Sequence, residues 1–251
     1  MSASAFAPIN PTAGMPLYRA VKRALLRAIE DGTLAPGATL PSEVPLAAAF
    51  GVSVGTLRQA VGELVAEHIL LRRQGRGTFV ATHSTERFLF QFFHVEHSDG
   101  RREAPTVELI AFERGRLDDE AADALGQCAG DAAWLVENRL LLQGRAVVHD
   151  RLALPMALFK GLTEKRFRGR PGTIYQLYQD ELAITVLRVQ ERARAVAASH
   201  AVSRVLGVAP GAPMLQLRRT ALSFGDRPVE YRVSTVHTAL HDYVQTLSRP
   251  G

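Results

Sequence analysis

Arg58 and Gln59 are adjacent side chains of the two types that most often read base edges in the major groove of DNA. A guanidinium matches the two acceptors of guanine, and an amide matches the donor and acceptor of adenine. Leu57, Val61 and Leu64 recur around them at helical spacing, so one helix face is buried and Arg58 and Gln59 lie on the other. The pattern predicts a helix whose free face contacts DNA, although the same face could simply be solvated.

Another helix should come directly before this one. Ser42 is placed to cap a short helix that ends near Phe50, Gly51 suits a left-handed stop, and Ser53 can cap the next helix. Two helices joined by so tight a turn predict a helix-turn-helix.

A glycine-rich hairpin follows the two helices. Residues 69–73 and 78–80 have the composition of strands and flank a Gln-Gly-Arg-Gly tip at 74–77. The glycines permit a tight turn, and Arg72, Arg73 and Arg76 place cations around it. The segment therefore predicts a basic wing beside the helix-turn-helix, a combination suited to double-stranded DNA.

The composition favours a polyanionic partner. The 251 residues carry a net charge of +5 with an isoelectric point of about 9.8, and Lys and Arg exceed Asp and Glu within residues 15–82. A hydrophobic content of 47% suffices for two cores. No apolar run reaches the roughly 20 residues of a membrane span, residues 1–14 do not resemble a signal peptide, and Cys128 is the single cysteine. We expect a cytoplasmic protein with no membrane partner and a disordered leader at 1–14.

Several short phrases between residues 15 and 82 occur in a characteristic order and spacing. They are Pro16-Leu17-Tyr18, Leu40-Pro41-Ser42-Glu43, Gly51-Val52-Ser53, Thr56-Leu57-Arg58-Gln59-Ala60 and Arg72-Arg73-Gln74-Gly75-Arg76-Gly77-Thr78-Phe79-Val80. With them, the segment resembles the winged-helix domain of the GntR family of bacterial transcription regulators. Residues at the starts of both helices and on the wing would then bind DNA: Ser42, Ser53, Val54, Gly55, Thr56, Arg58, Gln59, Arg72, Gly75, Arg76, Gly77 and Thr78.

Two positions depart from that family. Where Val44 and Val54 stand, the family usually has cationic side chains that contact operator DNA. Val54 with Gly55 could instead let the backbone approach closely and touch a thymine methyl group. The base preference should therefore differ from that of the commoner family operators.

The second half of the chain contains an internal duplication. Gly126 and Gly207 are 81 positions apart, as are Gly144 and Gly225, and each pair lies in a similar helix-turn-hairpin pattern. Residues 83–100 should be a linker and a first, phenylalanine-rich strand, 173–180 a helix and 184–197 a long strand. An antiparallel sheet with helices is expected at 101–248, so the fold class is α+β.

Three phrases in this half carry a second resemblance. They are Arg170-Pro171-Gly172-Thr173-Ile174-Tyr175, Val189-Gln190-Glu191-Arg192-Ala193-Arg194-Ala195 and Pro228-Val229-Glu230-Tyr231-Arg232. The region resembles the UTRA effector domain, which is similar in fold to chorismate lyase and places the chain in the HutC branch of the GntR family. The resemblance implies an effector-binding and dimerisation domain.

The candidate effector residues come from strand alternation and from this resemblance. Glu230, Arg232 and Ser234 share one strand face, which could line a ligand pocket or be the solvated side of the sheet. The resemblance adds further positions, and the full set is Arg139, Asp150, Thr173, Tyr175, Glu230, Arg232 and Ser234. Related sugar-phosphate sensors use two arginines where only Arg139 is found here, so a carboxylate or another small metabolite is as plausible as an amino-sugar phosphate.

The sequence thus predicts a homodimeric regulator that binds a pseudo-palindromic operator as a repressor under effector control. Two alternatives are a chorismate lyase-like enzyme carrying a DNA-binding head, for which no nucleophile-base pair stands out, and an architectural DNA-binding protein. No cofactor or metal is expected: His237 and His241, like His94 and His97, lack a third ligand at suitable spacing.

Overall fold

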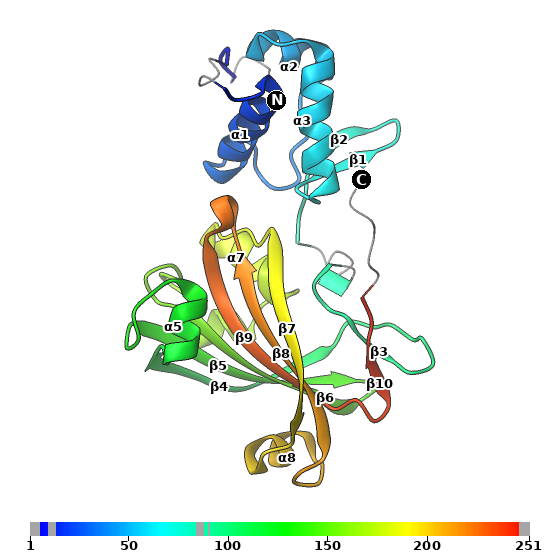
Figure 1. The fold of residues 1–251 in the computed structure, drawn as a ribbon, viewed down its shortest axis with the longest axis vertical. Helices are drawn as coiled ribbons and strands as arrows, with labels where there is room; N and C mark the ends of the chain where they lie inside the picture. Colours follow the sequence, from blue (N-terminus) through cyan, green and yellow to red (C-terminus); the bar gives the residue numbers. More distant parts are fainter. Residues whose placement is uncertain (1–5, 10–13, 84–87, 90, 246–251) are drawn as a thin grey trace. The chain divides into compact units, whose positions relative to one another are not determined.

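The computed structural model describes residues 6–9, 14–83, 88–89 and 91–245 (Figure 1). The chain divides into two compact units, Met1–Thr82 and His83–Gly251. No single helix among the described residues is long and apolar enough to cross a membrane. The helix pair α2 (Glu43–Phe50) and α3 (Val54–Ala66), which would pass on length and composition, is bent by 105°.

The first unit contains three helices followed by a hairpin. These are α1 (Leu17–Glu30), α2 (Glu43–Phe50), α3 (Val54–Ala66), β1 (Leu70–Arg73) and β2 (Gly77–Val80). The apolar faces of the helices meet in a core that includes Val21, Leu25, Leu46, Leu57 and Leu64, all of them buried. The helix-turn-helix and the wing are therefore present as the spacing predicts.

The turn between α2 and α3 depends on local capping. Ser53 Oγ accepts a hydrogen bond from the Thr56 amide at 3.1 Å, and Gly51 takes the left-handed conformation with φ 68° that ends α2. Ser42 occupies the cap position of α2 without a side-chain capping bond. His68 has φ 56°, in the left-handed region where a glycine would be easier to accommodate.

Contacts outside the predicted pattern hold the first unit together. Lys22 on α1 pairs with Glu63 on α3 at 2.8 Å, which ties the two helices across their polar edge. In the segment predicted to be a disordered leader, the Ile9 amide donates to the Phe50 carbonyl at 3.0 Å, and the ring of Phe6 lies 5.1 Å from that of Phe50. Residues 1–5 and 10–13 of that segment lie outside the described residues.

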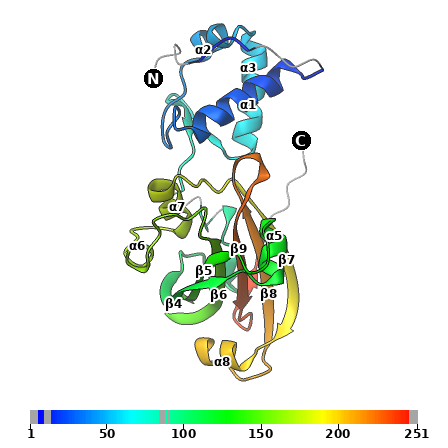
Figure 2. The same ribbon diagram turned by 90° about the vertical axis from the view of Figure 1, so that its left-hand side faces the viewer.

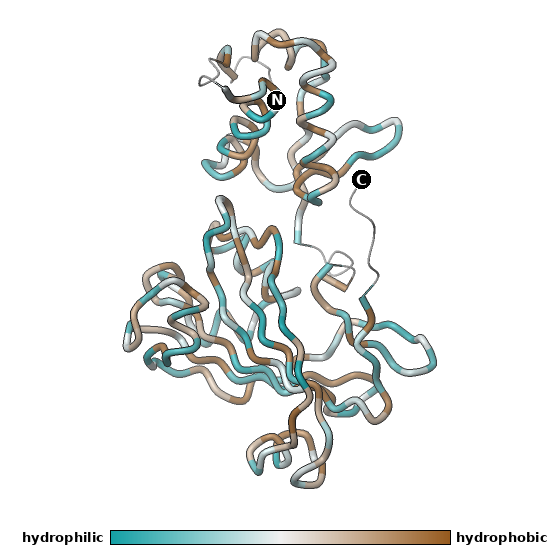
Figure 3. The backbone as a smooth tube through the Cα atoms, viewed as in Figure 1, coloured by the Kyte–Doolittle hydropathy of each residue, from teal (hydrophilic) through white to brown (hydrophobic). Residues whose placement is uncertain are grey.

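The second unit is built on a six-stranded antiparallel sheet in the order β4-β5-β6-β9-β8-β7 (Figures 1 and 2). The strands are β4 (Thr106–Arg116), β5 (Ala132–Leu142), β6 (Arg145–Pro155), β7 (Arg188–Ala197), β8 (Pro213–Leu222) and β9 (Pro228–Val236). Half of the residues of the edge strand β7 have charged or amide side chains (Figure 3), as suits an edge that must resist pairing with other chains.

Helices cover both faces of this sheet. The helices are α5 (Asp119–Leu125), α6 (Glu164–Arg168), α7 (Ile174–Leu182) and α8 (His200–Leu206), with a short 3₁₀ turn η2 (Phe224–Asp226). Tyr175 and Leu177 of α7 belong to the main core with Val136 and Leu152, whereas α5 packs against Ala153 and its neighbours on the opposite face. A separate two-stranded sheet pairs β3 (Val95–His97) with β10 (His241–Tyr243).

The duplication is confirmed in three dimensions. Each repeat is a strand, a short helix and a hairpin, namely β4-α5-β5-β6 and β7-α8-β8-β9, and the two helices end on the left-handed residues Gly126 and Gly207. The last strands of the two repeats, β6 and β9, pair antiparallel at the centre of the sheet. Register shifts also recur at equivalent places, between Leu140 and Leu141 and between Ala221 and Leu222.

Two sequence expectations for this unit were wrong in detail. Phe88, Leu89 and Gln91 are helical, and the only strand in this stretch of the described residues is the short β3, although Phe88 and Phe92 are buried in the core as predicted. Large aromatic side chains can be buried equally well from a helix and from a strand. The composition of this segment therefore could not distinguish a helix from a strand. The strand predicted from residue 184 starts at Arg188, because Ala183 at φ 54° ends α7 and an irregular segment follows.

Candidate DNA-binding surface and effector pocket

The exposed face of α3 carries the two side chains from which a DNA-binding role was predicted. Arg58 and Gln59 are both exposed, while their neighbours Leu57 and Ala60 are fully buried. The burial of one face fixes the helix, and the other face is left to a partner. The arrangement is the one required of a recognition helix.

Arg58 forms an ion pair within the first unit. Its Nε lies 2.6 Å from Oε2 of Glu43 in the first turn of α2, with the Arg58 side chain 64% exposed. An ion pair so open to solvent contributes little free energy and exchanges readily for a phosphate or a base. Val44, next to Glu43, is 69% exposed, so this position presents an apolar surface.

The wing supplies the cations beside this helix. Arg72, Arg73 and Arg76 are all exposed, and the tip is closed by Gly75 at φ 69° and Gly77 at φ 104°, where a side chain would strain the backbone. A groove of about 380 Å³ runs between the wing and the start of α2, and its lining includes Ser42, Glu43, Arg72, Gly75, Gly77 and Thr78. The remaining predicted residues, Ser53, Val54, Gly55 and Thr56, form the start of α3.

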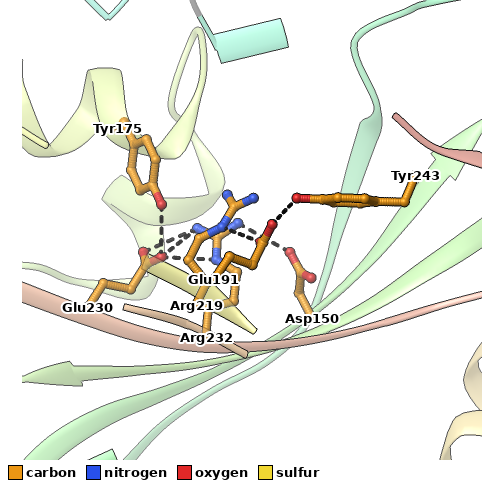
Figure 4. A network of polar contacts seen from close by, with 7 residues as sticks. All are labelled: Asp150, Tyr175, Glu191, Arg219, Glu230, Arg232 and Tyr243. Atoms are coloured by element: carbon orange, nitrogen blue, oxygen red, sulfur yellow. Dashed lines mark hydrogen bonds and ion pairs between the residues drawn. The ribbon is translucent and has the colours of Figure 1, made fainter. Parts of the chain in front are cut away.

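The polar row predicted on β9 forms a buried ion-pair network in the second unit (Figure 4). Arg232 binds Glu230 through two nitrogens, with Nε to Oε1 at 2.9 Å and Nη2 to Oε2 at 3.1 Å. Because β6 pairs with β9 in the register Asp150 to Ser234, Asp150 lies on the same face, and its Oδ2 is 3.3 Å from Nη1 of Arg232. The row is thus the inner side of the sheet, and the alternative of a solvated face does not hold.

Two tyrosines of α7 complete the coordination of Glu230. The hydroxyl of Tyr175 donates to Oε1 at 3.2 Å and that of Tyr178 to Oε2 at 2.7 Å. Burial, with the nearby Glu230 carboxylate as a second cause, raises the pKa of Tyr175 to about 12. Glu230 is fully buried, so its charge is balanced inside the protein by one guanidinium and two hydroxyl donors.

A pocket of about 100 Å³ lies between the sheet and the start of α7. It is lined by Asn138, Asp150, Thr173 and Arg232, together with apolar side chains and Arg170. Three buried polar atoms of its lining residues have no hydrogen-bond partner among the described residues: Oδ1 of Asn138, Oδ1 of Asp150 and Nε of Arg170. Buried polar groups are rarely left unpaired, so the pocket is prepared for a polar ligand or ordered water.

The structure brings together some of the predicted effector residues and separates others. Thr173 lines the pocket and also caps α7, accepting from the Gln176 amide at 3.2 Å. Tyr175 acts through Glu230, and Ser234 faces a smaller neighbouring cavity of about 20 Å³. Arg139 does not belong to this group, because it pairs with His149 across the strands, one residue from Asn138, and so lies on the opposite face of the sheet.

Arg139 is instead occupied by an acidic partner on that face. Its Nε donates to Oε2 of Glu108 at 2.7 Å, and the side chain is 41% exposed. Sequence reasoning passed over Asn138 and Arg170 as ligand-binding candidates. Alternation along β5 could have pointed to Asn138, because it interrupts the buried series Val136, Leu140 and Leu142 with a polar side chain.

A second buried ion pair lies next to the first. Nε of Arg219 on β8 is 2.8 Å from Oε1 of Glu191 on β7, and the hydroxyl of Tyr243 on β10 donates to Oε2 of Glu191 (Figure 4). These side chains occupy the space on this part of the sheet, and a cavity of only about 20 Å³ remains beside Arg219. The histidines considered as metal ligands do not assemble a site: within the described ranges, no group of three or more His, Cys, Asp or Glu side chains could hold a metal ion.

Comparisons with known proteins agree with this two-part geometry. Residues 17–80 match the family described as bacterial regulatory proteins of the gntR family, and residues 100–242 match the UTRA domain. The chain belongs to the GntR family, in its UTRA-containing branch. This GntR-family chain is a DNA-binding transcription regulator with an effector-binding domain, and the relatives give no support to the enzyme alternative.

Several relatives match over nearly the whole chain. The HTH-type transcriptional repressor NagR of Bacillus subtilis is 28% identical over 242 residues, covering 96% of this chain and 98% of that protein. The mannosyl-D-glycerate transport/metabolism system repressor MngR of Escherichia coli is 28% identical, covering 92% of this chain and 95% of its own. The histidine utilization repressor of Klebsiella aerogenes is 36% identical over 121 residues, about half of either chain.

Solved structures show the same fold. The ligand-binding domain of a GntR-family regulator from Bordetella bronchiseptica superposes with a TM-score of 0.61 at 31% identity, covering 63% of this chain and 99% of that one. YydK from Bacillus subtilis superposes with a TM-score of 0.56 at 17% identity, covering 93% of this chain and all of that one. The regulator therefore has the winged-helix and UTRA folds in one chain.

Proposed function

We propose that this regulator is a homodimeric repressor that binds a pseudo-palindromic operator in the cytoplasm and releases it when a small metabolite occupies the pocket beside α7. The observation that carries the first part is the exposed pair Arg58 and Gln59 on α3, with the wing arginines in the same unit. The three unpartnered polar atoms of the pocket carry the second.

On DNA, α3 enters the major groove from its N-terminal end. Arg58 leaves Glu43 and binds a base edge or a phosphate, Gln59 reads the neighbouring base, and Val44 and Val54 offer apolar surface to thymine methyl groups. Arg76 at the wing tip reaches the minor groove, and Arg72 and Thr78 hold the backbone. Two heads on a dimer would contact two half-sites, which explains the expected operator symmetry.

The effector works by differential binding. A ligand changes operator affinity only if it stabilises one arrangement of the dimer over another. Three relatives that match over most of their length are named repressors, and their names support relief of repression as the outcome. We further propose that the chain acts by binding alone, since Arg232, which lines the pocket, is held by two hydrogen bonds to Glu230.

Binding to the promoter of its own gene, compared with random DNA of equal length at fixed salt, tests the proposal. We expect Arg58→Ala to weaken promoter binding by about 10- to 100-fold and to relax specificity, because a base contact is worth about 1–3 kcal/mol. Arg76→Ala should reduce the slope of log affinity against log salt by about 1. The measurement is fluorescence anisotropy of labelled DNA.

The matched control is Arg23→Ala, which removes the same charge from the same unit but beside the segment 6–9. It should alter affinity equally for both DNAs and leave specificity unchanged. A promoter-to-random ratio near one for the wild type would instead favour an architectural protein. Light scattering tests the dimer, and release of pyruvate from chorismate would revive the enzyme alternative.

A further inference from the structure

The pocket beside α7 has one end that accepts hydrogen bonds. Asn138 on β5 and Asp150 on β6 face each other in register across the two strands, and the two residues are only 3% and 2% exposed. The Oδ1 atoms of both are buried without a partner among the described residues. Two adjacent acceptors, one of them a carboxylate oxygen, require a ligand that donates hydrogen bonds.

The other end of the pocket offers hydrogen-bond donors. Arg170 stacks its guanidinium 4.5 Å from the Phe167 ring centre and donates Nη1 to the Phe167 carbonyl, which leaves Nε unpartnered. No carboxylate of the described part of the chain forms an ion pair with it, and burial lowers its pKa. Gly172, Thr173 and Ile174 at the start of α7 line the same end, and a helix N-terminus favours negative charge.

The remaining charge in the lining is already balanced. Arg232 is held by two bonds to Glu230 and has only one longer contact, at 3.3 Å, to Asp150. The pocket therefore presents one cation lacking an anionic partner, Arg170, and one carboxylate with a free oxygen, Asp150. A ligand with two negative charges and no positive charge would satisfy the first and be repelled by the second.

The volume limits the size of the ligand. A space of about 100 Å³ is well below the roughly 300–1,000 Å³ of pockets that take drug-sized molecules. It is also smaller than the cavity of about 150 Å³ that takes benzene. The buried part of the ligand is a few heavy atoms long, which suits a compact metabolite with its polar groups at opposite ends.

From these observations we propose that the effector is a small zwitterion whose carboxylate binds Arg170 and the α7 N-terminus and whose amino group binds Asn138 and Asp150. This inference rests on the effector role given to the pocket under the proposed function. It excludes phosphorylated sugars that have no amino group, because they carry two negative charges and no cation.

Thermal shifts of the full-length protein against a defined panel test the inference. The panel contains the proteinogenic amino acids, β-alanine and γ-aminobutyrate as zwitterions. Propionate, butyrate, propylamine and butylamine carry only one of the two charges, and inorganic phosphate and glucose 6-phosphate represent the excluded class. We expect at least one zwitterion to raise Tm saturably, its single-charge analogues to give no shift at tenfold higher concentration, and the phosphates to give none.

Variants of Arg170 and Asp150 then test the role of each end of the pocket in binding the ligand. Arg170→Gln and Asp150→Asn should each abolish the shift, while Arg168→Gln and Asp123→Asn, exposed residues of the same types, should retain it. If either pocket variant lowers the unliganded Tm strongly, tryptophan fluorescence titration below that Tm replaces the thermal assay. The active zwitterion should also weaken operator binding at least tenfold in the wild type.

Two results would overturn the inference while leaving the proposed function intact. One is an operator-binding protein that answers to a phosphate or a simple carboxylate, with dependence on Arg170 but not on Asp150. The other is an operator-binding protein that no zwitterion of the panel shifts. Failure of the unliganded protein to prefer its promoter would count against the proposed function itself, and the two failures are therefore separate.

Discussion

The two repeats of the effector domain have the same backbone arrangement but different side chains at matching positions of the sheet. In the second repeat Glu191 on β7 stands opposite Arg219 on β8, and the two form a buried ion pair. At the matching place in the first repeat Leu109 on β4 stands opposite Asn138 on β5. The first repeat leaves a pocket of about 100 Å³ there, whereas about 20 Å³ remains beside Arg219.

The central strands show the same contrast. β6 and β9 pair so that Asp150 lies opposite Ser234 and Leu152 opposite Arg232, and the local twofold symmetry of this pairing makes Asp150 the counterpart of Arg232. The acid of one repeat thus faces the base of the other across the repeat boundary. The comparison teaches that one copy of the duplicated frame uses its polar positions for its own ion pair, while in the other copy they line the pocket that we propose holds the effector.

Removing the acid from the filled repeat should have the largest effect. Glu191→Gln leaves Arg219, 7% exposed, as a buried cation without its partner, and we expect the domain to lose about 3–5 kcal/mol of unfolding free energy. Urea unfolding followed by fluorescence of Trp134, the single tryptophan and a residue of β5, measures it. Glu164→Gln, which breaks an exposed pair on α6, should cost less than about 0.5 kcal/mol. Equal losses in both variants would mean that the buried pair is not structural.

The buried hydroxyl of Tyr175 on α7, which donates to Glu230, should affect the stability of the domain at high pH. Tyr175 has a folded-state pKa of about 12 because of burial, above the value of about 10 in an unfolded chain. Its protonated form is therefore favoured by folding, so its contribution is complete below pH 10 and disappears as the pH rises through 12. We expect Tyr175→Phe to remove about 2–3 kcal/mol of the alkaline loss of stability, measured by circular dichroism in urea between pH 8 and 12. An unchanged pH profile would place the Tyr175 hydroxyl outside the network.

The frame of both repeats could be predicted from sequence, because it depends on local signals. Glycines at helix ends and turns repeat 81 positions apart, and each has the backbone role expected of it, as Gly126 and Gly207 show. The helix-turn-helix was predictable for the same reason, since Ser53, Gly51 and the buried face of α3 all act within a few residues.

The residues that line the pocket were harder to predict from the sequence. Arg139 and Asn138 are adjacent in sequence, and only the pairing register with β6 decides which of them faces Asp150; a shift of one residue would exchange them. Arg170 reaches the pocket from the segment before α7, a tertiary relation that no periodicity encodes. The phenylalanines near residue 90 were assigned correctly to the core and wrongly to a strand, since burial and element type are separate questions.

Grafting the filled pattern into the open repeat would test whether the two sites are equivalent. Asn138→Arg alone places an unpaired cation in a buried position and should destabilise the domain, while adding Leu109→Glu should restore about 0.5–3 kcal/mol as coupling energy. The double variant should bind the operator as tightly as the wild type and fail to release it with any effector. A full cycle of both single variants and the double variant gives the coupling. If the coupling is zero, the two positions are not counterparts in space.

The smallest effect should come from making the open repeat apolar instead of charged. Asn138→Leu removes a buried amide oxygen that has no partner in the described chain and replaces it with a side chain of similar size. Because an unsatisfied buried acceptor costs free energy that an apolar group does not, we expect the variant to be more stable by about 1 kcal/mol in urea, again read from Trp134. The same change should abolish the effector response, since the ligand loses an acceptor and part of its space. A gain in stability with loss of response is what separates a binding position from a structural one. A loss of stability would instead mean that Asn138 is satisfied by ordered water and serves the fold of the first repeat, as Arg219 serves that of the second.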